Sequence, residues 1–464
     1  MFIKKPIAIC SSEFVCLIGV QKIFCRCIEI FLELFTKNME KRLLLLVALA
    51  GLARYYFQGF QWIGDRVEVS TPINSYKRVQ EGIYLYENGI DPYIGDVVHE
   101  LPVILVLLVR IFGVISSYVP LFYVLIDLLT AMLLYKLAQK FVRTKLVEQK
   151  VEALQFAVGT EELQVQISDL DMIPRCVLLA YLFNPLALLS CAGLTSTVLS
   201  NFLLASTLYF LAQRQLLPCI MCLALETMRN LYPLVLIAPV VLVFTQRAKS
   251  TTTAAIGVLS LFAVACLAIT GLNYALIQSW SFVDATLGFI FLYRDLQPNI
   301  GLFWYFFTEM FEHFRTMFLI TFQMNATVLY LVPLSLKLRK EPLLLATVLI
   351  ALMSIFRSYP SVGDVSFYLA LLPLWRRCWK FMAHNFVVFC FFVVTLCMMP
   401  ALWQLWIYSG SANANFYFGT TLAFSTGQIF LVTDLLFAHV KRDFCLRNGL
   451  KVYIDGKEAK IILE

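Results

Sequence analysis

The chain has 464 residues, of which 60% are hydrophobic and only 14% are charged, and its mean hydropathy is +0.78. A soluble domain is about 45–50% apolar and about 25% charged, so this composition excludes an ordinary soluble protein. A membrane-spanning helix needs roughly 20 mostly apolar residues, and the chain has material for about 10–12 transmembrane helices. The sequence therefore predicts an all-α, polytopic membrane protein. Its net charge of +7 lies between the apolar stretches and indicates membrane topology, not nucleic-acid binding.

The first 38 residues differ from the rest of the chain. They carry four cysteines, and their apolar stretch is interrupted by four charged side chains, so it reads neither as a clean signal peptide nor as a clean span. We expect an N-terminal extension of unknown role at 1–38. A multi-pass region at 39–440 should follow, because a basic flank precedes its first apolar span, and a basic, cytosolic tail should occupy 441–464.

Residues 59–100 are expected to leave the membrane. This segment has seven acidic side chains against three basic ones, and because basic residues concentrate on cytoplasmic loops, we expect it on the lumenal side. Apolar side chains recur at helical spacing from Tyr76 to Tyr86, and Asn88-Gly89 is a typical helix stop. The pattern predicts an amphipathic helix lying on the membrane surface.

The remaining apolar stretches leave one conflict about topology. Lys136 to Lys150 carries five basic side chains against one acidic, and apolar residues at helical spacing follow, so the inter-span segment 139–174 should contain a cytosolic amphipathic helix. Two complete crossings at 101–119 and 120–138 would instead place that helix in the lumen, so one of these interpretations must be wrong. The stretches that we expect to span or re-enter the membrane are 101–119, 120–138, 175–192, 195–213, 216–244, 253–276, 286–307, 313–336, 341–357, 363–381, 385–408 and 415–440.

Few charged side chains interrupt these spans, and we expect most of them to be structural. Glu226 and Arg229 lie three positions apart on one helix face, and an ion pair that joins two helices is the favoured interpretation. Asp127 and Asp434 are single acids that should cap or bridge neighbouring helices. Asp364 follows a turn and is well placed to cap the next helix.

The segment Asp295–Phe314, DLQPNIGLFWYFFTEMFEHF, joins an aromatic run to three ionisable side chains. A proline suits a first helical turn, so we expect Asn299 to Phe314 to form one helix with Glu309, Glu312 and His313 on a single face. Ionisable groups are costly at membrane depth unless they face a cavity, a ligand or a partner. The segment therefore predicts the rim of a site.

Two further segments carry polar groups suited to a ligand. Ser409–Asn415 consists of small, uncharged residues between aromatic ones, and such residues suit binding of a sugar or a lipid head group. A tight lumenal turn between two helices explains the same residues. Asp65 and Glu68 lie just past the first span, where a GT-C glycosyltransferase keeps its general base, but loop charges are an equal explanation. The sequence shows no Ser/His/Asp or Cys/His grouping, no metal-ligand spacing and no glycine-rich phosphate loop.

Six stretches carry a resemblance to a known family. They are DRVEVSTPINSYKRVQEG (65–82), DPYIGDVVHELP (91–102), LFNPLALLSC (182–191), DLQPNIGLFWYFFTEMFEHF (295–314), SYPSVGDV (358–365) and LWIYSGSANANFYF (405–418). Together they resemble the PIG-U family, the polytopic subunit of the endoplasmic-reticulum GPI transamidase. The resemblance covers the chain from about residue 40 to the C-terminus, in the same order.

This resemblance implies a role in a membrane enzyme complex. The GPI transamidase cleaves a C-terminal signal peptide and joins the new carboxyl end to the ethanolamine of a GPI lipid. The resemblance assigns cleavage to the cysteine-protease-like subunit PIG-K, and it implies PIG-T, PIG-S and a metallopeptidase-like membrane subunit as further partners. It implies neither a catalytic residue nor a cofactor nor a nucleic-acid partner for this chain.

The stretch from 65 to 102 is also similar to the GPI mannosyltransferase PIG-M, which carries an Asp-x-Asp motif where this chain has Asp65 and Glu68. That departure implies a GT-C-like helical bundle that still binds its glycolipid but has lost its glycosyltransferase activity. The two acids would then be vestiges of the former active site. We therefore expect a non-catalytic subunit, multi-pass in the endoplasmic-reticulum membrane, that receives the GPI lipid or the attachment signal.

The residues expected to line the lipid site are Asn299, Trp304, Glu309, His313, Asn413 and Asn415. One alternative is a lumenal GT-C mannosyltransferase that uses a dolichol-linked sugar, with Asp65 or Glu68 as its base. Another is a pure scaffold.

Overall fold

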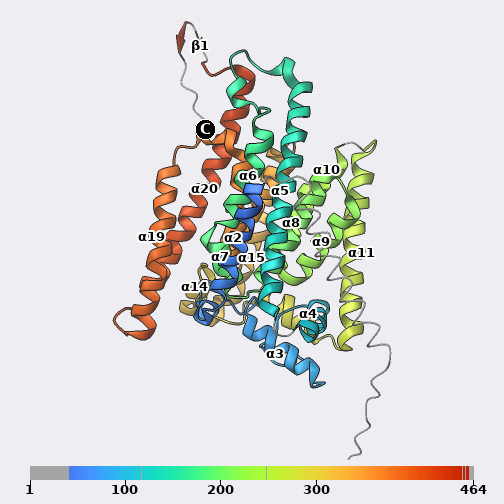
Figure 1. Cartoon of the computed structure of the whole chain (residues 1–464), viewed down its shortest axis with the longest axis vertical. Coiled ribbons are helices and arrows are strands. Elements are labelled where there is room, and N and C mark those ends of the chain that lie inside the picture. Colours follow the sequence, from blue (N-terminus) through green and yellow to red (C-terminus); the bar gives the residue numbers. More distant parts are fainter. Residues whose placement is uncertain (1–40, 116–117, 247, 452, 455, 459–464) are drawn as a thin grey trace, which may run out of the picture.

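Figure 1 shows the computed structural model as an elongated bundle of helices. The residues that it describes are 41–115, 118–246, 248–451, 453–454 and 456–458. The prediction for residues 1–38 lies outside this described part. The described part is helical apart from its loops and a short hairpin in which β1 (Tyr453–Ile454) pairs antiparallel with β2 (Lys457–Glu458). The prediction of an all-α, polytopic membrane protein is confirmed.

The helices divide into two groups along the chain. The first group consists of α2 (Lys41–Phe57), η1 (Gln61–Asp65), α3 (Tyr76–Glu87), α4 (Pro102–Ile115), α5 (Val119–Glu152), η3 (Ala153–Gln155), η4 (Glu161–Leu163), α6 (Asp169–Leu182), α7 (Pro185–Ala192), α8 (Thr197–Gln213), α9 (Leu216–Asn230), η5 (Tyr232–Leu236) and α10 (Ile237–Thr245). The second consists of α11 (Thr251–Ile277), α12 (Ser281–Val283), η6 (Asp284–Gly288), α13 (Phe289–Leu292), α14 (Phe303–Glu309), α15 (Glu312–Met324), η7 (Asn325–Leu329), α16 (Leu331–Lys337), α17 (Pro342–Phe356), α18 (Val362–Leu371), η8 (Leu372–Phe381), α19 (Asn385–Trp403), η9 (Gln404–Tyr408) and α20 (Ala414–Asn448).

Among the described residues, five helices are long and apolar enough to cross a membrane. They are 119–155, 251–277, 312–337, 385–408 and 414–448. A sixth span arises if α6 and α7, which meet at a bend of 47°, act as one. Five more apolar helices are shorter, so the expected number of about 10–12 complete crossings stays a prediction.

One end of the bundle gathers the basic loops. Lys145 of α5 pairs with Glu341, just before α17, at 2.6 Å, and Arg377 of η8 pairs with Asp169 of α6 at 2.5 Å. The guanidinium of Arg442 donates to a backbone carbonyl in η4 at 2.9 Å. Because basic residues favour the cytoplasmic side, we assign this end to the cytosol.

The opposite end gathers the acidic loop 59–100 and the turn between α19 and α20 (Figure 1). Arg78 of α3 pairs there with Asp295 at 3.0 Å, and the N–H of Ser196 donates to the carbonyl of Asn74 at 3.0 Å. Because the acidic loop is predicted to be lumenal, we refer to this end as the lumenal end. The predicted helix of this loop is confirmed as α3, which ends at Glu87 with Asn88 as its C-cap, before Gly89 takes a φ of 71°. Its position on the membrane surface stays a prediction.

The short helix α4 removes the topology conflict. It has 14 residues, which is about 21 Å and too short for a hydrocarbon core of about 30 Å. It lies beside α3 at the lumenal end in Figure 1, and the N–H of Val103 at its start donates to Asn273 near the end of α11. The expected crossing at 101–119 is therefore wrong, and α5 begins at the lumenal end.

The helix expected within 139–174 begins as a continuation of the preceding span. A single helix, α5, runs for 34 residues from Val119 to Glu152, because neither glycine nor proline stops it after residue 138. Its last turns stand beyond the apolar part of the span. The apolar positions that suggested a packed face, such as Val151 and Leu154, are exposed there.

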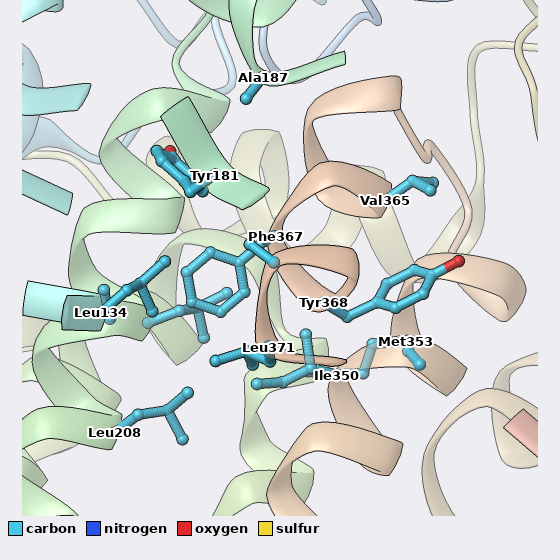
Figure 2. Packing of buried hydrophobic residues seen from close by; sticks show 14 of the residues in the cluster. Leu134, Tyr181, Ala187, Leu208, Ile350, Met353, Val365, Phe367, Tyr368 and Leu371 are labelled. Atoms are coloured by element: carbon cyan, nitrogen blue, oxygen red, sulfur yellow. The ribbon is translucent and has the colours of Figure 1, made fainter. Parts of the chain in front are cut away.

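The core centres on α18, which buries eight of its ten residues. In Figure 2, Phe367 of α18 points toward Leu134 of α5, whereas Tyr368 points to the opposite side, where its hydroxyl donates to Gln428 of α20 at 3.0 Å. Within a membrane such close packing, rather than a hydrophobic driving force, holds helices together. The helix therefore joins the two groups of helices at the centre of the bundle.

The single intramembrane acids have the structural roles predicted for them. Asp127 of α5 receives a hydrogen bond from Arg54 of α2 and, at 2.7 Å, from Tyr181 of α6, so it bridges three helices. Asp434 of α20 accepts from two backbone N–H groups at the start of α19, at 2.9 and 3.0 Å. Asp364 caps α18 in a reciprocal arrangement with Ser361.

The predicted Glu226–Arg229 pair is confirmed at 3.0 Å, and it belongs to a larger buried network. Arg229 of α9 also reaches across to Glu100, before α4, with two bonds of 2.7 Å each. Glu226 accepts from Asn230 at 2.6 Å, and Asn230 accepts from Arg357 at 2.8 Å. Glu100, Arg229, Asn230 and Arg357 border a small polar cavity, and because the charged groups of the network neutralise one another, we assign the network to stability.

Candidate functional site

The segment singled out as a site rim is not one helix. α14 ends at Glu309, the next two residues are extended, with ψ of 139° at Met310 and 134° at Phe311, and α15 begins at Glu312. The residues from Asp295 to Leu302 are not helical either. The prediction of a single helix with Glu309, Glu312 and His313 on one face is therefore wrong.

Asn299 explains why the helix starts late. Its side-chain oxygen accepts from the N–H of Gly301 at 2.8 Å, and its amide donates to the carbonyl of Gln297 at 3.3 Å. These local bonds stabilise a turn in competition with the helix. The side chain is fully buried, so Asn299 shapes the entry to α14 from inside the protein.

Six aromatic residues from the two halves of the second helix group meet at the lumenal end. We name them the lumenal aromatic cluster: Trp304, Tyr305, Trp403, Trp406, Tyr417 and Phe418. Tyr305 stacks on Phe418 with ring centroids 4.5 Å apart, and Trp304 lies 6.0 Å from Tyr417. The cluster joins α14 to the tip of the α19–α20 pair.

Asn413 and Asn415 lie at the edge of this cluster. Asn413 is the N-cap of α20, where its side chain accepts from the N–H of Asn415 at 3.1 Å. The side chain of Asn415 accepts a hydrogen bond from the hydroxyl of Tyr305. Both asparagines remain exposed, and the turn interpretation of Ser409–Asn415 is compatible with their position beside a ligand.

One buried polar atom inside the cluster, Nε1 of Trp304, has no hydrogen-bond partner among the described residues, and Trp304 is only 3% exposed. The hydroxyl of Tyr417, which is 0% exposed, has the carboxylate of Glu68 as its polar neighbour. Aromatic residues that merely line a membrane interface keep their polar end in water. Burying a donor without a partner costs about 1–3 kcal/mol, and a bound ligand with an oxygen acceptor would remove that cost.

The other predicted site residues divide between this cluster and its surroundings. Glu309 lies four positions after Tyr305 on the same face of α14 and is exposed, so it stands at the rim of the cluster. His313 is exposed on α15, where its ring contacts Phe314, and no contact joins it to Asn413 or Asn415. The structure therefore brings Trp304, Asn413 and Asn415 to the cluster, and leaves Asn299 and His313 apart from it. Glu309 is related to the cluster only by its spacing from Tyr305 on α14.

An apolar hollow borders α14 on another side. It holds about 970 Å³ and is lined by residues of α14, α15, η7 and α17, including Phe303, Phe322 and Leu329. Phe303 and Phe322 meet edge to face, with centroids 5.2 Å apart. Two neighbouring residues of α14 thus point to different surroundings. Trp304 belongs to the lumenal aromatic cluster, and Phe303 lines the apolar hollow.

The two acids predicted as vestiges of a glycosyltransferase are both neutralised. Asp65 is exposed and pairs with Lys77 at 2.5 Å, and Glu68 is buried with Arg66 at 2.9 Å. Glu68 lies close enough to Tyr417 for an electrostatic interaction, which places this loop beside the cluster. A general base needs a free carboxylate within reach of its substrate, and neither acid has that geometry here.

Sequence reasoning missed most of the cluster. Tyr305, Trp403, Trp406 and Tyr417 belong to aromatic runs that the sequence displays, but only their ring contacts in the folded protein distinguish them from lipid-facing residues. The signal that could have found them is the position of Tyr417 two residues after Asn415 and of Trp406 just before the polar turn.

His99 fixes the lumenal loop to the rest of this end. Its Nδ1 donates to the carbonyl of Ala285 at 2.7 Å, while Nε2 accepts from Arg78 at 3.0 Å, so the ring is held in its neutral form. Burial lowers the pKa of His99 from its ordinary 6.5 to about 4.

This arrangement predicts a pH dependence. Because the folded pKa lies below the unfolded one, the stabilisation by His99 is complete above pH 6.5 and is lost as the pH falls toward 4. We expect the melting temperature of the purified chain to fall across this window, and to fall less in a His99→Gln variant. Equal slopes for the two proteins between pH 6.5 and 5 would contradict the assignment.

The comparisons with known proteins agree with this architecture. Residues 44–424 match the family model described as GPI transamidase subunit PIG-U. Three of the most similar relatives are named GPI-anchor transamidase component PIGU. The Cricetulus griseus protein is 39% identical over 420 residues, the Homo sapiens protein 38% over 420 and the Mus musculus protein 39% over 415. Each comparison covers 87% of this chain and 94% of the relative. The chain belongs to the PIG-U family of GPI transamidase subunits.

Proposed function

We propose that this protein is a non-catalytic subunit of the GPI transamidase that holds the GPI lipid at the lumenal aromatic cluster and presents its head group to the catalytic subunit. The family supports the complex, because relatives over most of the chain are named as its components. The proposal places the protein in the endoplasmic-reticulum membrane with PIG-K as the catalytic partner and with PIG-T, PIG-S and a metallopeptidase-like membrane subunit.

The observation that carries this proposal is the unpartnered indole N–H of Trp304 inside the cluster, next to the buried hydroxyl of Tyr417. The indole N–H of Trp304 can donate to a sugar or phosphate oxygen, and the hydroxyl of Tyr417 can donate or accept. The flat rings around them offer apolar faces to the C–H groups of a sugar, and the exposed amides of Asn413 and Asn415 offer both donors and acceptors at the edge.

The surroundings match the remaining parts of a GPI lipid. The carboxylate of Glu309 at the rim suits a cationic ethanolamine amine, which is the group that must reach the catalytic subunit. The apolar hollow beside Phe303 has room and lining for acyl chains. α14 would then separate the polar head group from the chains, which fixes the lipid in one orientation.

Such binding contributes to the reaction without a bond-making residue in this chain. Holding a reacting amine in a near-attack position supplies several kcal/mol of a barrier through orientation alone. The mannosyltransferase alternative has no specific support, since both of its candidate acids are paired with basic neighbours and the named relatives are transamidase components.

The double variant Trp304→Phe with Tyr417→Phe tests the proposal. It removes an indole donor that has no partner within the described protein and a hydroxyl whose polar neighbour, Glu68, is already paired with Arg66, so a purely structural role predicts little change in stability. A binding role predicts a loss of roughly 5-fold for each lost hydrogen bond in the display of GPI-anchored proteins. The measurement is surface GPI-anchored protein by flow cytometry, in cells that lack the endogenous subunit.

Matched controls are available in the same chain. Trp375 and Tyr123 are buried and also have no hydrogen-bond partner among the described residues, but they lie outside the cluster. Their Phe variants should leave anchoring unchanged. Normal anchoring by the double variant in an intact complex would overturn the binding role, and an equal loss in the controls would reduce it to a folding effect.

A further inference from the structure

The cytosolic end contains two adjoining hollows of about 580 and 960 Å³. They share four lining residues, Thr144, Glu148, Ala212 and Arg214, so they form one continuous space that we name the basic hollow. It lies where α5, α8, α10 and α17 reach the cytosolic boundary of the bundle, on the opposite side of the membrane from the lumenal aromatic cluster.

The basic hollow has an excess of positive charge. Five basic and two acidic side chains line it, which is a net charge of +3. The basic residues are Lys140, Arg143, Lys145, Arg214 and Lys340, and the acidic ones are Glu148 and Glu341.

Lys145 alone compensates both acids, with ion pairs of 2.9 Å to Glu148 and 2.6 Å to Glu341. Within the described part of the chain, Lys140, Arg143 and Lys340 form no ion pair or hydrogen bond. Three cationic heads are therefore left to attract an anion.

Apolar side chains also line the hollow, and we name them its apolar wall. They are Phe141 of α5, Leu211 of α8, Val243 of α10 and Leu343 of α17. The positive-inside rule explains basic residues at this end, but it does not explain a hollow with one basic and one apolar wall. A free inorganic anion would make no favourable contact with the apolar wall. A phospholipid would contact the basic side chains with its head group and the apolar wall with an acyl chain.

The start of α17 adds a further attraction for negative charge. No side chain caps this helix, and its first residues, Pro342 and Leu343, line the hollow. The first N–H groups of a helix lack partners within it and carry a partial positive charge. An anionic phosphate at this height would meet both these groups and the basic side chains.

We propose that the basic hollow binds an anionic glycerophospholipid of the cytosolic leaflet, with its phosphate and acidic head group among the basic side chains and an acyl chain along the apolar wall. Basic pockets between transmembrane helices on the cytosolic side are suited to such head groups. This site is independent of the lumenal lipid site and would fix the height and tilt of this end of the bundle in the membrane.

The test compares two double variants of the full chain. Lys140→Gln with Arg143→Gln removes two unpaired cations of the hollow and leaves the Lys145–Glu341 pair intact. Lys337→Gln with Arg339→Gln removes the same charge from exposed positions at the same end that do not line the hollow. Each protein is reconstituted with phosphatidylcholine vesicles, with and without phosphatidylserine, and retained lipid is counted by native mass spectrometry.

The expected result is selective retention of phosphatidylserine by the natural protein and a roughly 25-fold weaker selectivity in the first double variant, since each basic residue near an anionic surface is worth about a factor of five. The second double variant should keep its selectivity. Because Lys140 is half-buried, the single exposed variant Arg143→Glu keeps the test decisive if the double variant does not fold.

Three outcomes would overturn the proposal. They are equal retention of the two lipids by the natural protein, equal weakening in both double variants, and displacement of the lipid by soluble glycerophosphoserine at equal concentration. Equal weakening in both double variants would show that diffuse surface charge, and not the hollow, retains the lipid. Displacement by glycerophosphoserine would show that the hollow binds a free anion without contact between an acyl chain and the apolar wall.

Discussion

Substituting Arg229 with methionine is expected to lower the free energy of unfolding by about 3–5 kcal/mol, because it leaves two buried carboxylates without their cation. Glu100 loses two bonds of 2.7 Å and Glu226 loses one of 3.0 Å, and both acids are at most 5% exposed. The measurement is thermal unfolding of the purified chain in detergent, together with the yield of folded protein.

Removing all of the charges distinguishes an unpaired-charge effect from a loss of packing. A triple variant, Arg229→Met with Glu100→Gln and Glu226→Gln, keeps the volume and removes the uncompensated carboxylates, so we expect it to recover at least half of the lost stability. The exposed pair Lys380–Glu162 is a suitable control, and its Lys380→Ala variant should melt like the natural protein. A single Arg229→Met variant that melts normally would contradict the structural assignment of this network.

Replacing Gly363 with alanine is expected to destabilise the bundle by about 1–3 kcal/mol through overpacking. A Cβ at this position would lie 2.5 Å from Oγ of Ser190 and 2.9 Å from Cγ2 of Thr197, so α18 would have to move away from α7 and α8. The effect should appear as a lower melting temperature in detergent. A second change, Ser190→Ala, removes the nearer contact and should restore part of the loss.

Gly271 of α11 is the matched control for this prediction. It is also a helical glycine, but a Cβ added there would meet no atom within 4 Å, so Gly271→Ala should cost nothing or stabilise slightly. Equal losses at both positions would show that general helix effects, and not the close approach of α18, determine the result.

Local signals in the sequence were sufficient for some elements and not for others. The stop at Asn88-Gly89 fixed the end of α3, and isolated acids such as Asp434 could be assigned to capping because a charge in an apolar helix has few other uses. The break after α14 has no such signal, since neither glycine nor proline occurs at Met310 or Phe311. Met310 packs against the core and Phe311 is 80% exposed, and neither residue type marks a helix end in the sequence.

Long-range contacts limited what could be predicted of the site. The aromatic run around Trp304 and the polar turn before Asn415 were both recognised, but Tyr305 and Asn415 lie 110 positions apart, and no periodicity relates them. In the same way, Arg229 was paired only with its neighbour Glu226, whereas its closest bonds reach Glu100, 129 positions away. The sequence identifies which residue types are present in each segment. Which residues from distant segments come into contact depends on the fold, and no local pattern predicts it.

The composition of the lumenal aromatic cluster also has a consequence for biosynthesis. The ribosome makes the chain from its N-terminus, so α14 reaches the membrane well before α20, which completes the cluster, has been synthesised. Until the C-terminal hairpin inserts, Trp304 is uncovered and the incomplete protein displays aromatic surface of the kind that chaperones retain. On this view, the proposed ligand site at the lumenal aromatic cluster forms only after translation of the chain has finished.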